Sequence, residues 1–373
     1  MLPASGAWRP GDPLGHRRLH RLAGPLALRA GGRLPDVQVA YETWGELAPD
    51  GSNAVLVLHA LTGDSHLAGP TGPGHPSPGW WDDLLRPGAA LDPARWFVVA
   101  PNAVGGCQGS TGPSSAAPDG RAWGSRFPEL SLRDLVTAEA ALADALGVGQ
   151  WAAVVGGSLG GMRALEWAAA EPDRVRRLFL LATAAYADAD LIGNVDTQLR
   201  AIALDPHWRG GDYHDAPPGQ GPHEGLGLAR RIAHLSYRAA PDLARRFGRA
   251  PQDGEDPAAG GRYAVQSYLD HHGEKLARRF DAGSYVAISR AMLSYDVGDG
   301  RGGTAAALAG IRAVTTVAGI DSDRLFPLAD QRLLADGIPG TGGLHVIRSD
   351  FGHDGFLLET LQVGPLLAEL LQR

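Results

Sequence analysis

The sequence is 373 residues long, which is enough for one large domain with an insertion or for two domains. Apolar residues make up 44% of the chain and charged residues 20%, a balance that excludes an intrinsically disordered protein. The net charge of −7 argues against nucleic acid or an anionic membrane surface as the main partner.

The cellular location is predicted from what the sequence lacks. No segment is apolar for long enough to cross a membrane. Residues 1–25 carry basic side chains but have no continuous apolar core, so they do not resemble a secretory signal. The single cysteine, Cys107, excludes an internal disulfide and a metal site built from several cysteines. We therefore expect a cytoplasmic protein.

The first half of the chain alternates strands with helices. Apolar runs predict an antiparallel edge hairpin from residues 26–28 and 37–44, buried strands at 55–60, 97–102, 151–155 and 175–182, and helices at 131–146 and 162–168. Continuous apolar strands that alternate with helices indicate a mostly parallel sheet covered on both faces.

The pattern changes in the second half. Helical stretches are predicted at 189–203, 225–237, 263–280 and 283–294 with no convincing strand between them, then strands at 313–319 and 344–347 and helices at 325–337 and 361–371. We therefore predict an α/β core made of residues 1–184 and 307–373, interrupted by a helical insertion at 185–306.

The strand at 151–155 leads into Gly156-Gly157-Ser158-Leu159-Gly160, which fits the G-x-S-x-G nucleophile elbow. This motif turns a buried strand sharply into a helix and exposes one hydroxyl at the top of the sheet. The turn is crowded, so its flanking positions favour glycine. A serine in this context predicts covalent catalysis with Ser158 as the nucleophile.

A serine hydroxyl needs a base and a group that orients the base. In this fold the order along the chain is Ser, then Asp or Glu, then His. Asp321 and Asp323 follow the strand at 313–319, and His353 follows the strand at 344–347. The pattern predicts His353 as the base, and by itself it does not choose between the two carboxylates.

The charge on a tetrahedral intermediate needs backbone donors. One is the N–H of Leu159, directly after the nucleophile, and the other is the N–H of Leu61 or Thr62, after the strand at 55–60. The sequence has no Walker loop, dinucleotide fingerprint or cluster with metal-ligand spacing, so we expect no metal and no cofactor. Nothing places a base beside Cys107, which we interpret as structural.

Five separated motifs, spread from about residue 41 to residue 356, closely resemble the homoserine O-acetyltransferases, which are α/β-hydrolase-fold acyltransferases of methionine biosynthesis. The motifs are His59-Ala60-Leu61-Thr62-Gly63-Asp64, Gly105-Gly106-Cys107-Gln108-Gly109-Ser110-Thr111-Gly112-Pro113, Gly156-Gly157-Ser158-Leu159-Gly160-Gly161-Met162, Asp321-Ser322-Asp323-Arg324-Leu325-Phe326-Pro327 and Gly352-His353-Asp354-Gly355-Phe356. The family often has Met where this chain has Leu159, a position that supplies a backbone N–H.

The resemblance implies roles for individual residues. It implies Ser158 as nucleophile, His353 as base and Asp323 as the orienting carboxylate. It also implies that Arg230 holds the carboxylate of homoserine and that Asp354 holds its ammonium group. Acetyl-CoA would be a co-substrate in a ping-pong reaction, and the insertion would form a lid through which two copies make a homodimer.

Several alternatives stay open at this stage. The same motifs are shared by relatives that use succinyl-CoA or that accept serine in place of homoserine. An esterase of the same fold would carry the same triad, whereas a receptor or scaffold of this fold usually lacks a triad member. Arg231, beside Arg230 in sequence, competes for the carboxylate-binding role.

Overall fold

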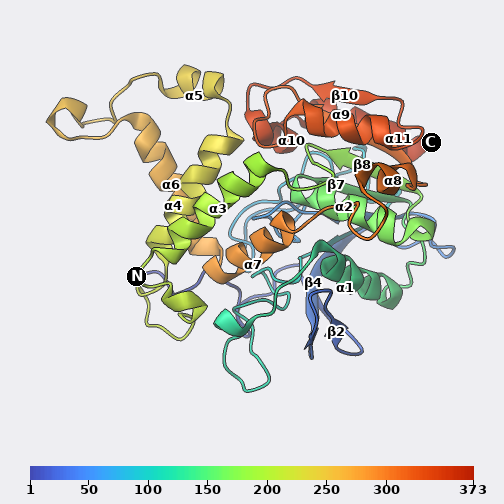
Figure 1. The fold of residues 1–373 in the computed structure, drawn as a ribbon, viewed down its shortest axis with the longest axis horizontal. Helices are drawn as coiled ribbons and strands as arrows, with labels where there is room; N and C mark the ends of the chain where they lie inside the picture. The colour runs from blue at the N-terminus through green and yellow to red at the C-terminus, as the bar shows by residue number, and fades with distance from the viewer.

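The computed structural model describes residues 1–373 and contains an eight-stranded sheet with helices on both faces (Figure 1). The order across the sheet is β1-β4-β6-β5-β7-β8-β9-β10; β1 and β4 run antiparallel to their neighbours and the other pairs are parallel. The strands are β1 (Arg18–Arg21), β4 (Gln38–Trp44), β5 (Ala54–Leu58), β6 (Phe97–Pro101), β7 (Ala153–Gly157), β8 (Arg177–Leu181), β9 (Val314–Ile320) and β10 (Leu344–Ile347). The mostly parallel sheet predicted from the apolar runs is therefore confirmed.

The predicted edge hairpin is wrong in its partners. The strand β4 pairs with β1, and residues 26–27 instead form β2 (Leu26–Ala27), which pairs with β3 (Arg33–Leu34) in a separate two-stranded sheet. β1 has the sequence Arg-Leu-His-Arg and lies mostly exposed at the sheet edge, so it carries no apolar alternation that would reveal it.

The predicted helices form close to their predicted positions, and three further short helices, the fifth, eighth and tenth in chain order, were not predicted. The helices are α1 (Leu132–Ala145), α2 (Leu159–Ala170), α3 (Ala189–Ala203), α4 (His223–Tyr237), α5 (Ala240–Phe247), α6 (Ala264–Arg279), α7 (Ala282–Leu293), α8 (Thr304–Ala309), α9 (Leu328–Gly337), α10 (Gly355–Leu358) and α11 (Thr360–Gln372). The short α5 was not predicted: Asp242 is its one buried residue, so it has no apolar stripe. No helix is long and apolar enough to span a membrane.

Alternate side chains of the central strands pack on opposite faces of the sheet. In β5, Leu56 and Leu58 join a core cluster with α1 and α2, whereas Val55 and Val57 join a second cluster with α11. Because the central strands are parallel, the loops after β5, β7, β9 and β10 meet at one edge. This is the edge where the candidate site residues lie.

The chain between β8 and β9 contains helices α3 to α8 and no strand. We call its part at residues 185–306 the lid. Figure 1 shows α4, α5 and α6 projecting away from the sheet, with the N-terminus near the first turn of α4 and far from α5. The N-terminal segment is bonded there, since Gly219 N donates to Leu2 O at 2.7 Å and His223 Nε2 bonds to Pro3 O at 2.8 Å.

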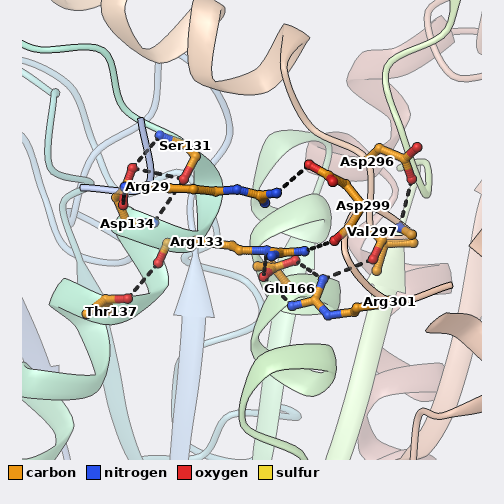
Figure 2. A network of polar contacts seen from close by, with 11 residues as sticks. Arg29, Ser131, Arg133, Asp134, Thr137, Glu166, Asp296, Val297, Asp299 and Arg301 are labelled. Carbon is orange, nitrogen blue, oxygen red and sulfur yellow. Dashed lines mark hydrogen bonds and ion pairs between the residues drawn. The ribbon is translucent and has the colours of Figure 1, made fainter. Parts of the chain in front are cut away.

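A polar network binds the segment after α7, where the chain leaves the lid, to helices α1 and α2 of the core (Figure 2). Glu166 of α2 is fully buried and binds both nitrogens of Arg301, at 2.6 and 2.9 Å. The same carboxylate lies 3.0 Å from Arg133 Nε of α1. Two guanidinium groups around one carboxylate hold α1, α2 and the segment after α7 together, which supports the helix that begins directly after Ser158.

Candidate active site

The strand-to-helix turn at Ser158 has the geometry that the motif requires. Ser158 has φ 58° and ψ −129°, a conformation that L-residues rarely adopt. A Cβ on Gly156 would lie 2.0 Å from Gly160 O, and a Cβ on Gly160 would lie 2.0 Å from Leu58 O. The two glycines are therefore required by close backbone contacts, and the turn presents the serine between β7 and α2.

The structure brings Ser158, His353 and Asp323 together in one hydrogen-bonded row. His353 Nε2 lies 2.9 Å from Ser158 Oγ, and His353 Nδ1 lies 2.7 Å from Asp323 Oδ2. The other carboxylate oxygen of Asp323 accepts the N–H groups of Leu325 and Phe326, at 2.8 and 3.0 Å. All three triad side chains are buried, so their geometry is fixed.

Asp321 lies on the same loop but does not reach the imidazole. Its Oδ1 accepts the N–H of Ser349 at 3.0 Å, and the residue is exposed. This contact ties the loop after β9 to the loop after β10. Asp323 is thus the carboxylate positioned to orient His353, in agreement with the family resemblance.

The backbone at Leu61 and Thr62 has the free donors expected of an oxyanion hole. Neither N–H group donates a hydrogen bond within the chain, and Gly63 N donates back to Ala60 O at 2.9 Å. Leu159 is the first residue of α2, so its N–H has no partner inside the helix. The geometry leaves both Leu61 and Thr62 as candidates for the second donor.

The loop that carries these donors is anchored to the core through His59. Its Nδ1 bonds to Ala60 O at 2.7 Å and its Nε2 accepts the N–H of Ala103 at 3.0 Å. Burial and the charge of Arg163 lower the pKa of His59 to about 3, so the ring stays neutral and can accept. Arg163 donates to His59 O at 3.3 Å and is itself paired with buried Glu139.

A cavity of about 560 Å³ lies between the lid and the loops at the sheet edge. Its wall is strongly cationic: the charged lining residues are Asp64, Arg230, Arg238, Arg246, Lys275, Arg279 and Asp354. Ser158 and His353 do not line this space; Thr62 does, on the side of the oxyanion loop. The cavity therefore borders the oxyanion loop at Thr62 and the residue after the base, Asp354, without including the nucleophile.

Two histidines in the cavity wall are held neutral. Burial lowers the pKa of His234 to about 2, and the charge of Arg230 acts in the same direction. Burial and the same arginine lower the pKa of His272 to about 4. These two rings therefore add no positive charge to the cavity wall near neutral pH.

Arg230 lies in the cavity wall, and its guanidinium has no carboxylate partner. Its Nη1 lies 3.5 Å from Thr62 Oγ1, and the group stacks over the ring of Tyr237 at 5.4 Å. Arg231 is instead bound to Asp270 and does not line the cavity. The two neighbours thus have different environments, as their positions on a helix require.

Asp354 also lines the cavity, and one of its oxygens is already occupied. Arg238 Nη1 donates to Asp354 Oδ2 at 3.1 Å, while Asp242 binds the same guanidinium at 2.7 Å. The side chain of Asp354 is 22% exposed. The second carboxylate oxygen makes no hydrogen bond and is free to accept one from a cation.

Sequence reasoning missed the residues that connect these groups. Tyr237 contacts both Arg230 and the base His353: the guanidinium of Arg230 lies over its ring, and its ring centroid is 5.8 Å from that of His353. It is seven residues after Arg230, which places both on one face of α4, and that spacing could have revealed it. The contacts of Arg238 with Asp354 and of Arg279 with Thr62 gave no signal, because they join residues 116 and 217 positions apart.

One cluster has residue types that could bind a metal. Glu42, His66 and His75 are buried, with candidate ligand atoms within 4.8 Å of one another. The two imidazoles are stacked with centroids 3.7 Å apart and planes 13° apart, so their in-plane lone pairs do not converge on one point. His75 Nε2 already accepts the N–H of His16, and Glu42 binds His66 at 3.0 Å. We interpret it as a hydrogen-bonded cluster.

Cys107 is buried in the main core cluster. Burial raises the pKa of its thiol, and the charge of Asp281 raises it further. A thiol kept protonated in this way is a poor nucleophile. This environment favours the structural interpretation.

Comparison with known proteins identifies the family. Residues 53–360 match the model of a family described as the alpha/beta hydrolase fold. Over 370 residues the chain is 64% identical to a protein of Thermobifida fusca (strain YX) named homoserine O-acetyltransferase, and the match covers 99% of this chain and 97% of that protein. The chain belongs to the homoserine O-acetyltransferase family. The predicted fold and family are confirmed.

Two solved structures with different names superpose on nearly the whole chain. The homoserine O-acetyltransferase from Bacillus anthracis superposes with a TM-score of 0.86 at 26% identity, covering 96% of this chain and 98% of that one. Esterase E22 superposes with a TM-score of 0.86 at 25% identity, covering 95% and 99%. A protein named as an acetyltransferase and a protein named as an esterase therefore both share the fold of this chain.

Proposed function

We propose that this chain transfers an acetyl group from acetyl-CoA to the γ-hydroxyl of L-homoserine, in methionine biosynthesis, through an acetyl-Ser158 intermediate. The observation that carries the proposal is the Ser158–His353–Asp323 row beneath a cavity with unpaired cations. The 64% identity to a protein named homoserine O-acetyltransferase supports it independently.

In the first half-reaction His353 Nε2 accepts the proton of Ser158 Oγ, and the oxygen attacks the thioester carbonyl carbon. The developing oxyanion accepts hydrogen bonds from Leu159 N–H and from Leu61 or Thr62 N–H; loss of one such donor costs about 10²- to 10³-fold in rate. The carbon–sulfur bond then breaks. His353 returns the proton to the sulfur of coenzyme A, and the acetyl group remains on Ser158.

In the second half-reaction the hydroxyl of homoserine enters the space left by coenzyme A. His353 accepts the proton of this hydroxyl while the hydroxyl oxygen attacks the acetyl carbon. The ester bond to Ser158 breaks, and Ser158 regains a proton from His353. The deep position of Ser158, which is 6% exposed, supports exclusion of water from the acyl-enzyme.

The cavity wall supplies complementary charges for both substrates. Homoserine carries a carboxylate and an ammonium group, and the free guanidinium of Arg230 and the free oxygen of Asp354 are suited to them. Lys275 is a further cation in the wall, and no carboxylate lies within ion-pair distance of it, which suits the phosphates of coenzyme A. Acetyl-CoA is thus a co-substrate, and no step needs a metal or a bound cofactor.

The proposal extends to assembly and location. Leu228 and Leu235 of α4 are 48% and 47% exposed and lie seven residues apart, so they form an apolar stripe on the lid. A second copy would cover this stripe in a homodimer. The use of acetyl-CoA, a metabolite inside the cell, supports a cytoplasmic location.

The alternatives differ in donor and acceptor. A succinyl-CoA donor or a serine acceptor would use the same triad, and an esterase would give the acetyl group to water. The test is a matrix of acetyl-CoA and succinyl-CoA against homoserine and serine, with products identified by mass spectrometry. The proposal predicts O-acetylhomoserine as the main product; release of coenzyme A at an equal rate without homoserine would instead identify a hydrolase.

A further inference from the structure

Thr62 is the point at which the lid touches the oxyanion loop. Arg279, the last residue of α6, donates from Nη1 to Thr62 O at 2.9 Å. Arg230 of α4 lies near the same residue, at its hydroxyl. The backbone that supplies a predicted oxyanion donor is therefore held from the lid by Arg279, whereas Arg230 approaches only the side-chain hydroxyl, at 3.5 Å.

The hydrogen bonds around this loop fix two of its peptide groups and leave peptide 61–62 free. Peptide 62–63 is held at both ends, because Thr62 O accepts from Arg279 and Gly63 N donates to Ala60 O. The carbonyl of Ala60 also accepts from His59, which fixes peptide 60–61. Peptide groups are planar, so the bond to Ala60 O sets the direction of the Leu61 N–H. The Thr62 N–H belongs to peptide 61–62, which lies between the two fixed peptides and is positioned by them at both ends.

The loop thus has two anchors of different origin. Arg163 binds His59 O from the core side, where a buried ion pair with Glu139 holds it. Arg279 is the anchor on the lid side. Its own position is fixed by Gln108, whose Nε2 donates to Arg279 O at 2.7 Å.

Arg279 has an environment unlike that of an ordinary surface arginine. No carboxylate lies within ion-pair distance of it, and its hydrogen bond is to the Thr62 carbonyl. Burial lowers its pKa, Asp64 acts in the opposite direction, and Arg230 adds to the lowering. A desolvated guanidinium that donates to one carbonyl gives a strong, directional contact.

We propose that Arg279 is a positioning residue for acyl transfer, which acts by holding the carbonyl of Thr62 so that the oxyanion loop keeps its donors aligned. The proposal rests on the proposed function only in assuming that Ser158 is acylated. It assigns to the lid a part in the chemistry of the first half-reaction, in addition to forming the cavity.

The test separates this role from phosphate binding, because Arg279 also lines the cavity. Acylation of Ser158 is measured with acetyl-CoA and with S-acetyl-N-acetylcysteamine, a thioester without phosphates. We expect Arg279→Gln to slow acylation by about 10- to 100-fold with both donors, since misplacement of a catalytic group by about 1 Å can cost 10². Arg279→Lys should recover part of the rate, because its ammonium can still donate to Thr62 O.

The matched control is Arg278→Gln, one residue earlier. Arg278 is 61% exposed, pairs with Glu274 at 3.7 Å and does not line the main cavity, so its acylation rates should stay at the wild-type value. Thermal unfolding of each variant checks the fold. If Arg279→Gln does not fold, Arg279→Lys carries the test, and its acylation rate must fall with both donors.

Two results overturn the proposal. A loss confined to a raised KM for acetyl-CoA, with a normal rate on the phosphate-free thioester, would make Arg279 a phosphate-binding residue. Wild-type rates with both donors would leave it no role in the reaction. Neither result depends on homoserine, so failure of acetyl transfer to homoserine would remain a separate finding about the proposed function.

Discussion

Replacing Asp323 by Asn should abolish the base while leaving the backbone in place. The amide oxygen of Asn can keep accepting the N–H groups of Leu325 and Phe326. The amide nitrogen would then face His353 Nδ1, which lies 2.7 Å from the carboxylate oxygen in the native chain. Because that nitrogen donates, His353 must carry its proton on Nε2, which points at Ser158 Oγ and can no longer accept.

The corresponding substitution in the best-studied serine triad lowers kcat about 10⁴-fold, and the hydrogen bonds here are equivalent. This ratio corresponds to about 5 kcal/mol of transition-state stabilisation. The assay follows release of coenzyme A with saturating homoserine, and a urea unfolding curve checks that the variant folds.

The control is Asp321→Asn, which should stay within about twofold of wild type, because Asp321 is exposed and its contact with Ser349 N can be kept by an amide oxygen. Equal losses in the two variants, or a larger loss at Asp321, would refute the assignment of the orienting carboxylate.

Two further predictions concern the cavity wall. Arg230→Ala should leave the burst of coenzyme A release unchanged and raise the barrier for transfer to homoserine by roughly 2–5 kcal/mol. Arg231→Ala should transfer normally, because the native Arg231 side chain is bound to Asp270. A slowed burst in Arg230→Ala would contradict carboxylate binding by Arg230. The pKa of His234 is about 2 in the folded chain against 6.5 ordinarily, so below pH 6.5 the unfolded chain binds a proton that the folded chain does not. The free energy of unfolding should therefore fall by about 1.4 kcal/mol per pH unit on acidification through this group, and His234→Gln should have a shallower slope in urea melts between pH 6 and 5; an unchanged slope would count against a buried neutral ring.

Local patterns predicted the core of the fold because its elements carry their own signals. The apolar run of β5 reads as a buried strand since both its faces are covered, and α3 was predicted at its observed bounds from its spacing. The exposed strand β1 and the helix α5 were missed, because neither buries an apolar stripe.

The candidate site divides in a similar way. Ser158 and His353 were predictable because strand ends and glycine spacing mark their loops. Motif spacing left Asp321 and Asp323 open, since both lie on one turn and the choice depends on side-chain direction. The contact between Arg279 and Thr62 joins residues 217 positions apart, so it follows from the packing of the lid and not from any local pattern.

The central claim is that Ser158 carries the acetyl group between two substrates. The most direct measurement is mass spectrometry of the chain mixed with acetyl-CoA in the absence of homoserine, followed by mapping of the modified peptide. We expect one acetyl group on Ser158, which disappears when homoserine is added as O-acetylhomoserine forms, and no adduct in Ser158→Ala. An acetyl group on another residue that is passed to homoserine, or normal turnover by Ser158→Ala, would contradict it.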